Sequence, residues 1–186
     1  MKTLLLNLPF NIYKAFDNTN LLQPFGLAMI SGFLKEKGFD TILYDAAAYN
    51  TKREEIIRYV SESNPQILGL TLVTQQMPQA IPLLGDIKKI LPEIIIVVGG
   101  AHPSADYSNL IEKHREIDIA VFGEGEQTMQ EIIECLKDEK SLNTVKGIAY
   151  RVNGKAMVNP HRELIQNLDS LPFADWGSLP MEKYWY

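Results

Sequence analysis

The sequence predicts an α/β fold: a five-stranded parallel sheet with helices on both faces, followed by a C-terminal β-hairpin and an extended arm. Two observations carry this prediction. Short apolar runs alternate with amphipathic stretches five times between residues 2 and 137, which is the pattern of successive βα units. Beyond residue 140 the pattern changes. We therefore expect one domain over residues 1–140, and a hairpin and linker over residues 141–186.

The predicted strands are short apolar runs that end at turn residues. The fourth run, Ile94 to Val98, is built from five branched apolar residues, as is typical of a strand buried on both faces of a sheet. The strands are expected at residues 2–8, 40–44, 66–73, 94–98 and 117–121.

The predicted helices show apolar residues at helical spacing and recognisable ends. Pro24 opens the first helix and Gly38 ends it, since proline suits the first turn and glycine the residue after the last. In the second helix, Thr51 is the expected N-cap and Glu54 its capping-box partner. The later helices are expected at residues 51–61, 78–91, 104–113 and 126–137.

Right-handed crossovers leave few possible strand orders for such a chain. We expect the flavodoxin-like order 2-1-3-4-5, in which ligands bind beyond the carboxyl ends of the strands. The next two apolar runs, at residues 147–151 and 155–158, flank Asn153-Gly154. An Asn-Gly pair between such runs is a strong hairpin signal. The remaining residues, rich in Pro, Asp and Trp, are expected to be a connector.

Composition narrows the function. The net charge is -5 and basic residues are not clustered, which argues against a nucleic-acid surface. The single cysteine, Cys135, excludes a disulfide framework and a three-cysteine iron-sulfur site within the chain. The run Leu4 to Leu6 is too short for a signal peptide or a membrane span. We therefore expect a cytoplasmic protein without a membrane span.

The loops at the carboxyl ends of the strands do not suit the common phosphate ligands. The turn after the first strand, residues 7–11, has no glycines for a dinucleotide. It also lacks the acidic pair of a phosphoacceptor receiver and the hydroxyl- and glycine-rich turn of a flavin phosphate site, and the chain has no P-loop. The remaining possibility is a bulky, apolar-faced cofactor across the strand ends.

Small residues follow three neighbouring strands, as such a cofactor requires. Glycine allows a ligand to approach the backbone closely and can adopt dihedral angles closed to other residues. The same glycines are also what tight βα turns need, so both interpretations remain open. The loops in question carry Gly99, Gly100 and His102 after the fourth strand, Gly123, Glu124, Gly125 and Glu126 after the fifth, and Thr71 and Thr74 after the third.

These motifs resemble the cobalamin-binding domains that precede radical S-adenosylmethionine domains. The matching residues are Gly99-Gly100-x-His102, Gly123-Glu124-Gly125-Glu126 with Thr128, Pro24-Phe25-Gly26-Leu27, Lys37-Gly38-Phe39, and the connector around Leu168 to Phe173 and Leu179 to Tyr184. The resemblance covers nearly the whole chain and implies cobalamin binding at the carboxyl edge. The implied cofactor-binding residues are Gln23, Gly26, Thr71, Thr74, Gly99, Gly100, His102, Gly123, Glu124 and Gly125.

The chain departs from the cobalamin-binding mutases and methionine synthase, which carry Asp-x-His-x-x-Gly after the first strand. Anchoring the comparison on Gly26 puts Leu21 at the Asp position and Gln23 at the position of the cobalt-ligating His. An amide is a much poorer cobalt ligand than an imidazole. The resemblance thus implies a cofactor whose own base is displaced, with no protein nitrogen on the cobalt.

The second departure is the missing Cys-x-x-x-Cys-x-x-Cys motif, which holds the iron-sulfur cluster of the radical domain. Cys135 stands alone, so we expect the chain to end before a radical domain of the same protein. That part would carry a 4Fe-4S cluster, S-adenosylmethionine and the small-molecule substrate, for methyl transfer or oxidative cyclisation.

An alternative is a degenerate domain that only positions or regulates its neighbour. In either case the arm aromatics are expected to cover the next domain or to drive self-association. These residues are Trp176, Tyr184, Trp185 and Tyr186.

Overall fold

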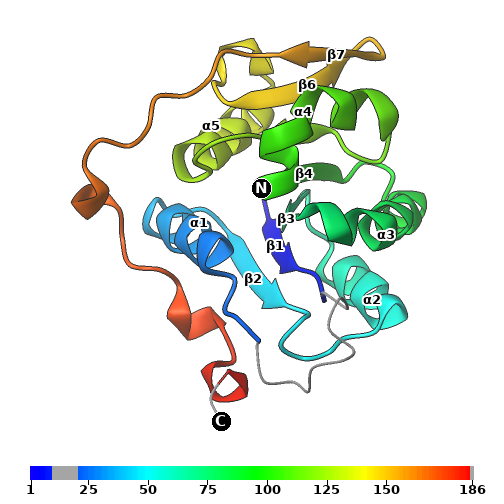
Figure 1. The fold of residues 1–186 in the computed structure, drawn as a ribbon, viewed down its shortest axis with the longest axis vertical. Helices are drawn as coiled ribbons and strands as arrows, with labels where there is room; N and C mark the ends of the chain where they lie inside the picture. The colour runs from blue at the N-terminus through cyan, green and yellow to red at the C-terminus, as the bar shows by residue number, and fades with distance from the viewer. Residues whose placement is uncertain (10–20, 185–186) are drawn as a thin grey trace.

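The sheet is larger than the predicted five strands. The computed structural model describes residues 1–9 and 21–184, and its strands follow the order β2-β1-β3-β4-β5-β6-β7 (Figure 1). Part of the predicted first loop, residues 10–20, lies outside the described residues. The strands are β1 Thr3–Asn7, β2 Thr41–Asp45, β3 Ile67–Thr71, β4 Ile95–Gly99, β5 Ile119–Val121, β6 Ile148–Val152 and β7 Lys155–Val158.

The predicted strand order and the parallel pairing of the first five strands are confirmed. β1 lies between β2 and β3, so that Leu5 is aligned with Leu43 on one side and Gly69 on the other. β4 and β5 continue the sheet in the same direction. This arrangement brings the carboxyl ends of five strands to one edge.

The C-terminal hairpin forms where it was predicted, but it belongs to the main sheet. Asn153 and Gly154 both have positive φ angles, 49° and 79°, as a two-residue type I′ turn requires. β6 then pairs with β5 in the antiparallel direction, and β7 pairs with β6. The hairpin extends the sheet beyond β5 and does not form a separate appendage.

The helices cover both faces of the sheet, as predicted. α1 and α5 lie on one face, and Figure 1 shows α2 and α3 on the opposite side. The helices are α1 Phe25–Glu36, α2 Arg53–Ser63, α3 Met77–Ile90, α4 Ala101–Lys113 and α5 Glu126–Lys137. None of the helices in the described residues is long and apolar enough to cross a membrane.

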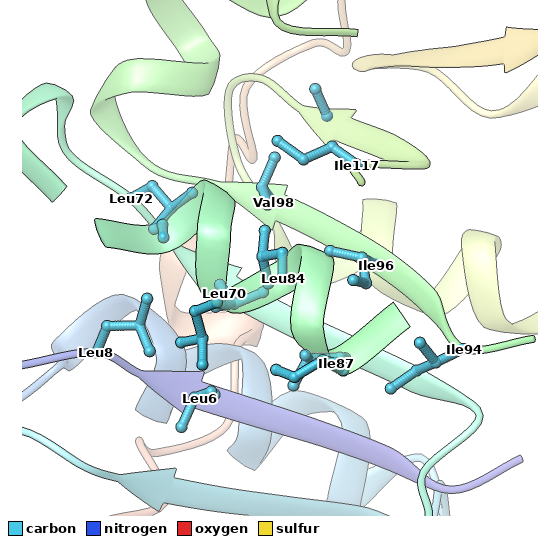
Figure 2. Close-up of a cluster of buried hydrophobic side chains, with 14 of the residues drawn as sticks. Leu6, Leu8, Leu70, Leu72, Leu84, Ile87, Ile94, Ile96, Val98 and Ile117 are labelled. Carbon is cyan, nitrogen blue, oxygen red and sulfur yellow. The ribbon is translucent and has the colours of Figure 1, made fainter. Parts of the chain in front are cut away.

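Side chains that alternate along the strands divide the core into two parts. One part lies beneath α2, α3 and α4, and Figure 2 shows how Leu6, Leu70 and Val98 from the strands meet Leu84 and Ile87 of α3. The other part lies beneath α1 and α5 and contains Leu5, Leu27, Met129 and Ile133, among others. A sheet buried on both faces explains why the strands read as continuous apolar runs.

The predicted helix ends are partly confirmed. α1 ends as expected, because Gly38 has φ +80° and the N–H of Phe39 donates to the Leu34 carbonyl over 3.0 Å. The expected N-cap of α2 is wrong by one residue, because Lys52 and not Thr51 takes that position. The helix begins at Arg53, and it is the Glu55 carboxylate that accepts from the Lys52 N–H, over 2.9 Å. The hydroxyl of Thr51 lies instead 2.9 Å from that of Tyr44.

The arm after β7 packs against its own domain. It runs along the outside of α5 and α1 and ends beside β2 (Figure 1). Tyr184 was expected to cover another domain or to drive self-association, but it finds its partners within this chain. Tyr184 is buried because its ring packs in the α1/α5 core and its hydroxyl donates to the Asp45 carboxylate. Trp185 and Tyr186 lie outside the described residues.

Candidate functional site

A cavity opens at the carboxyl edge of the sheet, between the strands and helices α1 and α5. Its volume is about 250 Å³. Most of the side chains around it are apolar and come from the strands and from both helices. The lining consists of Leu5, Gly26, Leu27, Ile30, Gly69, Leu70, Thr71, Val97, Gly99, Gly100, Val121, Gly123, Glu124, Gly125, Glu126 and Met129.

Two glycines form the floor of this cavity. Side chains alternate along a strand, so Gly69 of β3 and Gly99 of β4 face α1 and α5, as Leu5 and Val121 do. A Cβ atom on Gly99 would meet nothing closer than Val121, at 3.8 Å. One on Gly69 would lie 2.7 Å from the Leu5 side chain. Space that a strand side chain would normally fill is therefore left open above Gly99, whereas the Leu5 side chain occupies the space above Gly69.

Gly69 was not among the predicted site residues, although its sequence context contains a signal. It interrupts the apolar strand Ile67–Thr71. A glycine inside a strand weakens it, and often marks a place where a ligand or another backbone comes close. The glycine within this apolar run is thus the sequence signal that marks Gly69 as a site residue.

Gly100 is a glycine for a different reason. Its φ is +98°, and an added Cβ would lie 2.6 Å from the Thr71 hydroxyl and 3.0 Å from the Leu72 backbone. The turn itself thus requires glycine at this position, whether or not a ligand binds. At Gly123 the φ of +83° also favours glycine, but an added Cβ would meet no atom within 4 Å.

Helices α1 and α5 form the wall opposite the floor. They approach each other closely beside the cavity, where a Cβ on Gly125 would lie only 2.7 Å from Ile30. Leu27 and Met129 line the cavity further along the two helices. The separation of α1 and α5 therefore sets the width of the cavity.

The lining contains few polar side chains. The Glu124 carboxylate accepts a 2.6 Å hydrogen bond from the Ile165 N–H in the arm. Burial raises the pKa of Glu126 above the ordinary carboxyl value, and the neighbouring charge of Glu124 adds to this effect, although the backbone N–H groups of Glu126 and Gly125 oppose it. Thr71 supplies a hydroxyl. A ligand group in the cavity would thus meet mostly apolar atoms, with a hydroxyl and two carboxyls as hydrogen-bonding partners.

Seven of the ten predicted site residues line this cavity, namely Gly26, Thr71, Gly99, Gly100, Gly123, Glu124 and Gly125. Three do not. Thr74 and His102 lie beside each other after β3 and β4, with the Thr74 hydroxyl 3.1 Å from His102 Nδ1. Gln23 immediately precedes Pro24, the N-cap of α1. The proposed roles of all ten residues in cofactor binding stay predictions.

Sequence comparison relates the chain to proteins of known type. A family model described as "B12 binding domain" matches residues 19–133. An uncharacterized methyltransferase of Pyrococcus horikoshii is 32% identical over 87% of this chain and 35% of its own length. The anaerobic magnesium-protoporphyrin IX monomethyl ester cyclase of Synechocystis is 32% identical over the whole of this chain and 38% of its own length. The chain thus spans a little over a third of these relatives.

Solved structures agree with this relationship. The cobalamin-dependent S-adenosylmethionine radical enzyme OxsB, solved with aqua-cobalamin and S-adenosylmethionine bound, superposes with a TM-score of 0.74 at 27% identity. The match covers 88% of this chain and 22% of that one. The radical methyltransferase TsrM of Kitasatospora setae shares the fold, with a TM-score of 0.73 at 18% identity over 95% of this chain and 32% of that one.

The resemblance inferred from the glycine motifs is therefore confirmed. The family model covers most of the parallel sheet and the loops around the cavity. The relatives include a monomethyl ester cyclase and radical S-adenosylmethionine enzymes. The chain belongs to the B12-binding domain family and is similar to the cobalamin-binding part of cobalamin-dependent radical S-adenosylmethionine enzymes.

Proposed function

We propose that this chain binds cobalamin at the carboxyl edge of its sheet, as the cofactor domain of a radical S-adenosylmethionine enzyme. The observation that carries the proposal is the apolar cavity between α1 and α5, with Gly69 and Gly99 in its floor and open space above Gly99. Apolar walls and missing side chains suit a large, partly aromatic ligand, because glycine lets such a group lie close to the backbone.

The residues present fit a cofactor that binds with its own base displaced from the metal. The aromatic base would fill the apolar cavity, with Leu5, Val97 and Met129 around it. The Thr71 hydroxyl would donate the hydrogen bond that the free ring nitrogen accepts, and Glu126 would donate one only in its protonated form. The loops at Gly100 and Gly123 would hold the corrin. Bound in this way, the cofactor would supply a cobalt centre able to carry a methyl group.

We also propose that no protein nitrogen ligates the cobalt. We take Gln23, three residues before Gly26, as the counterpart of the cobalt-ligating histidine of the cobalamin-binding mutases and methionine synthase. His102 lies after β4, and its Nδ1 is already within hydrogen-bond distance of Thr74. Electron paramagnetic resonance of the bound Co(II) form tests this, since an axial nitrogen splits the signal. Splitting that disappears in a His102→Ala variant would identify His102 as a ligand. Splitting that persists would mean that the base has stayed on the metal.

The catalytic partner in this proposal is a radical domain that follows in the same protein. The chain spans a little over a third of the related methyltransferase and cyclase. That domain would contribute the 4Fe-4S cluster, S-adenosylmethionine and the pocket for a small-molecule substrate, for methyl transfer or oxidative cyclisation in the cytoplasm. Phe173 in the arm is 95% exposed, which suits a surface that another domain covers.

Titration with hydroxocobalamin tests the binding proposal directly. The visible spectrum should change on binding, and the melting temperature should rise. At a ligand concentration about 100 times Kd, the stabilisation should be about 2.7 kcal/mol, or about 5–10 °C for a chain of this size. A chain with neither response at high ligand concentration would contradict cobalamin binding. It would favour the alternative of a degenerate domain that only positions its neighbour.

A further inference from the structure

The arm is attached first to α5, at the side of the cavity. Arg162 is largely buried, and its Nε donates to the Thr128 hydroxyl over 2.9 Å. The same guanidinium forms an ion pair with Glu131 and lies 3.4 Å from the Lys146 carbonyl. A charged group with several partners in a shielded position holds its segment more firmly than an exposed ion pair does. The beginning of the arm is therefore fixed to α5.

The arm also reaches the rim of the cavity itself. The N–H of Ile165 donates to the Glu124 carboxylate over 2.6 Å, and Glu124 lines the cavity. The loop between β5 and α5 is therefore tied to the arm by a charge-assisted hydrogen bond.

A second attachment joins the arm to α1. The N–H of Asp175 donates to the Ala28 carbonyl over 2.9 Å. Its carboxylate accepts from the Ser31 hydroxyl over 2.6 Å and from Lys35 over 2.7 Å. Burial works to raise the pKa of Asp175, but hydrogen bonds from Lys35, Ser31 and Ser178 outweigh it and hold the pKa below the ordinary value. The carboxylate is thus better stabilised in this position than in water.

The arm approaches α1 so closely that the helix needs a glycine at the point of contact. A Cβ added to Gly32 would lie 2.4 Å from the Phe173 carbonyl oxygen and 3.4 Å from the Asp175 nitrogen. Gly32 lies inside α1 and has no positive φ, so the helix itself does not require glycine there. Since glycine weakens a helix by about 1 kcal/mol relative to alanine, the close approach of the arm is the feature that explains this residue.

We infer that the arm is a clasp that holds α1 and α5 at the separation the cofactor cavity needs, with Gly32, Arg162 and Asp175 as positioning residues for ligand binding. This inference rests on the proposed cobalamin binding. The two helices meet beside the cavity at Ile30 and Gly125, and the clasp is attached to each of them. Releasing it frees α1 to move relative to α5, and the walls of the cavity then lose their fixed spacing.

The test uses Gly32→Ala in the 186-residue chain, with Gly85→Ala as the matched control. Both replace a glycine within a helix, but a Cβ at Gly85 would make only an ordinary 3.7 Å contact with the Glu116 side chain, away from the arm. Hydrogen exchange at the amides of Ile165 and Asp175 reports whether the arm is attached. Titration with hydroxocobalamin reports affinity, and thermal unfolding reports the stability of the domain.

We expect Gly32→Ala to accelerate exchange at Asp175 and to weaken binding by about 5- to 150-fold, the usual range for coupled sites. The melting temperature should not fall in proportion, because alanine favours the helix. Gly85→Ala should change neither exchange in the arm nor affinity. Coupling is reciprocal, so hydroxocobalamin should slow exchange at Asp175 in the wild type, an effect that a purely structural role of Gly32 would not produce.

Two further results complete the test. Arg162→Ala releases the other end of the arm and should weaken binding in the same way. Faster exchange in the arm with unchanged affinity, in either variant, would overturn the clasp. So would unchanged exchange in both variants, because the arm would then not depend on these contacts. A wild-type chain that shows no spectral response would contradict the binding function itself, which is a different failure.

Discussion

Replacing Gly99 by valine should separate ligand binding from folding, because the two should change in opposite directions. Gly99 ends β4 on the face toward α1 and α5, and its φ lies outside the left-handed region. An added Cβ would make an ordinary contact with Val121, at 3.8 Å. Losing the flexibility of glycine in a strand is worth about 0.5–1 kcal/mol. The melting temperature of Gly99→Val should therefore rise by about 1–4 °C.

The new side chain would at the same time fill the floor of a cavity of only about 250 Å³. Forcing extra methyl groups into a filled site costs about 1–3 kcal/mol. If this cost destabilises only the ligand-bound state, the Kd for hydroxocobalamin should rise about 5- to 150-fold. The visible spectrum measures the affinity, and a thermal melt without ligand measures the stability.

Comparing Gly99→Val with the neighbouring variant Gly100→Ala shows why only the first can identify the site. Gly100→Ala lies next to Gly99, but its φ of +98° and the 2.6 Å approach to Thr71 should make it destabilising even without ligand. Loss of binding in that variant would therefore not identify the site. A Gly99→Val chain that is as stable as the wild type and binds hydroxocobalamin with unchanged affinity would refute the assignment of the cavity.

Three further predictions concern stability. Leu84→Ala removes a fully buried side chain from the core beneath α3 and should cost about 2–5 kcal/mol in chemical denaturation; a cost below about 1 kcal/mol would mean that this core is loosely packed. Glu126→Gln should raise the melting temperature at neutral pH, because the raised pKa of Glu126 means that folding disfavours its charged form. That gain in melting temperature should shrink as the pH falls through the raised pKa toward the ordinary 4.5. A gain that persists in acid would show that the charge of Glu126 is not its cause. Tyr184→Phe removes the hydrogen bond to the buried Asp45 carboxylate and should cost about 1.5–3 kcal/mol, with faster hydrogen exchange at the end of the arm; unchanged exchange there would show that this contact does not hold the arm.

The parallel sheet was predictable because its strands carry their own signals. Runs such as Ile94 to Val98 are apolar enough to be buried on both faces, and the helices between them have clear amphipathic spacing. The hairpin turn was predictable from Asn153-Gly154 alone. Its pairing with β5 was not, because local sequence fixes a turn but does not say which strand edge the hairpin will meet.

The site was predictable to the extent that it lies at the edge of the sheet. The glycine loops after β4 and β5 lie around the cavity, as expected from the parallel topology. Of the two glycines in the cavity floor, Gly99 was predicted and Gly69 was missed, since Gly69 lies within a strand and not in a loop. Nor could the sequence show that the turn itself requires glycine at position 100, because this depends on how closely Thr71 and Leu72 approach Gly100 in space.

The attachment of the arm was the least predictable feature. Residues 159–184 carry no regular periodicity, and their contacts with α1 come from residues about 140 positions away in the chain. The burial of Tyr184 was not predictable, because neither Asp45 nor the core beneath α1 and α5 is near it in sequence. Such long-range contacts leave no local pattern.

The hairpin and the arm also cover strand edges with which other chains could pair. An unpaired outer strand offers free N–H and carbonyl groups to any extended segment, and so promotes aggregation. β6 occupies the outer side of β5, and the arm turn Trp176–Ser178 packs beside β2, the strand at the other end of the sheet. The outermost strand that remains, β7, is only four residues long and carries the charged, exposed Lys155. A fragment cut at residue 140 would expose the side of β5 and lose the cover beside β2, so we expect it to aggregate where the longer chain remains dispersed.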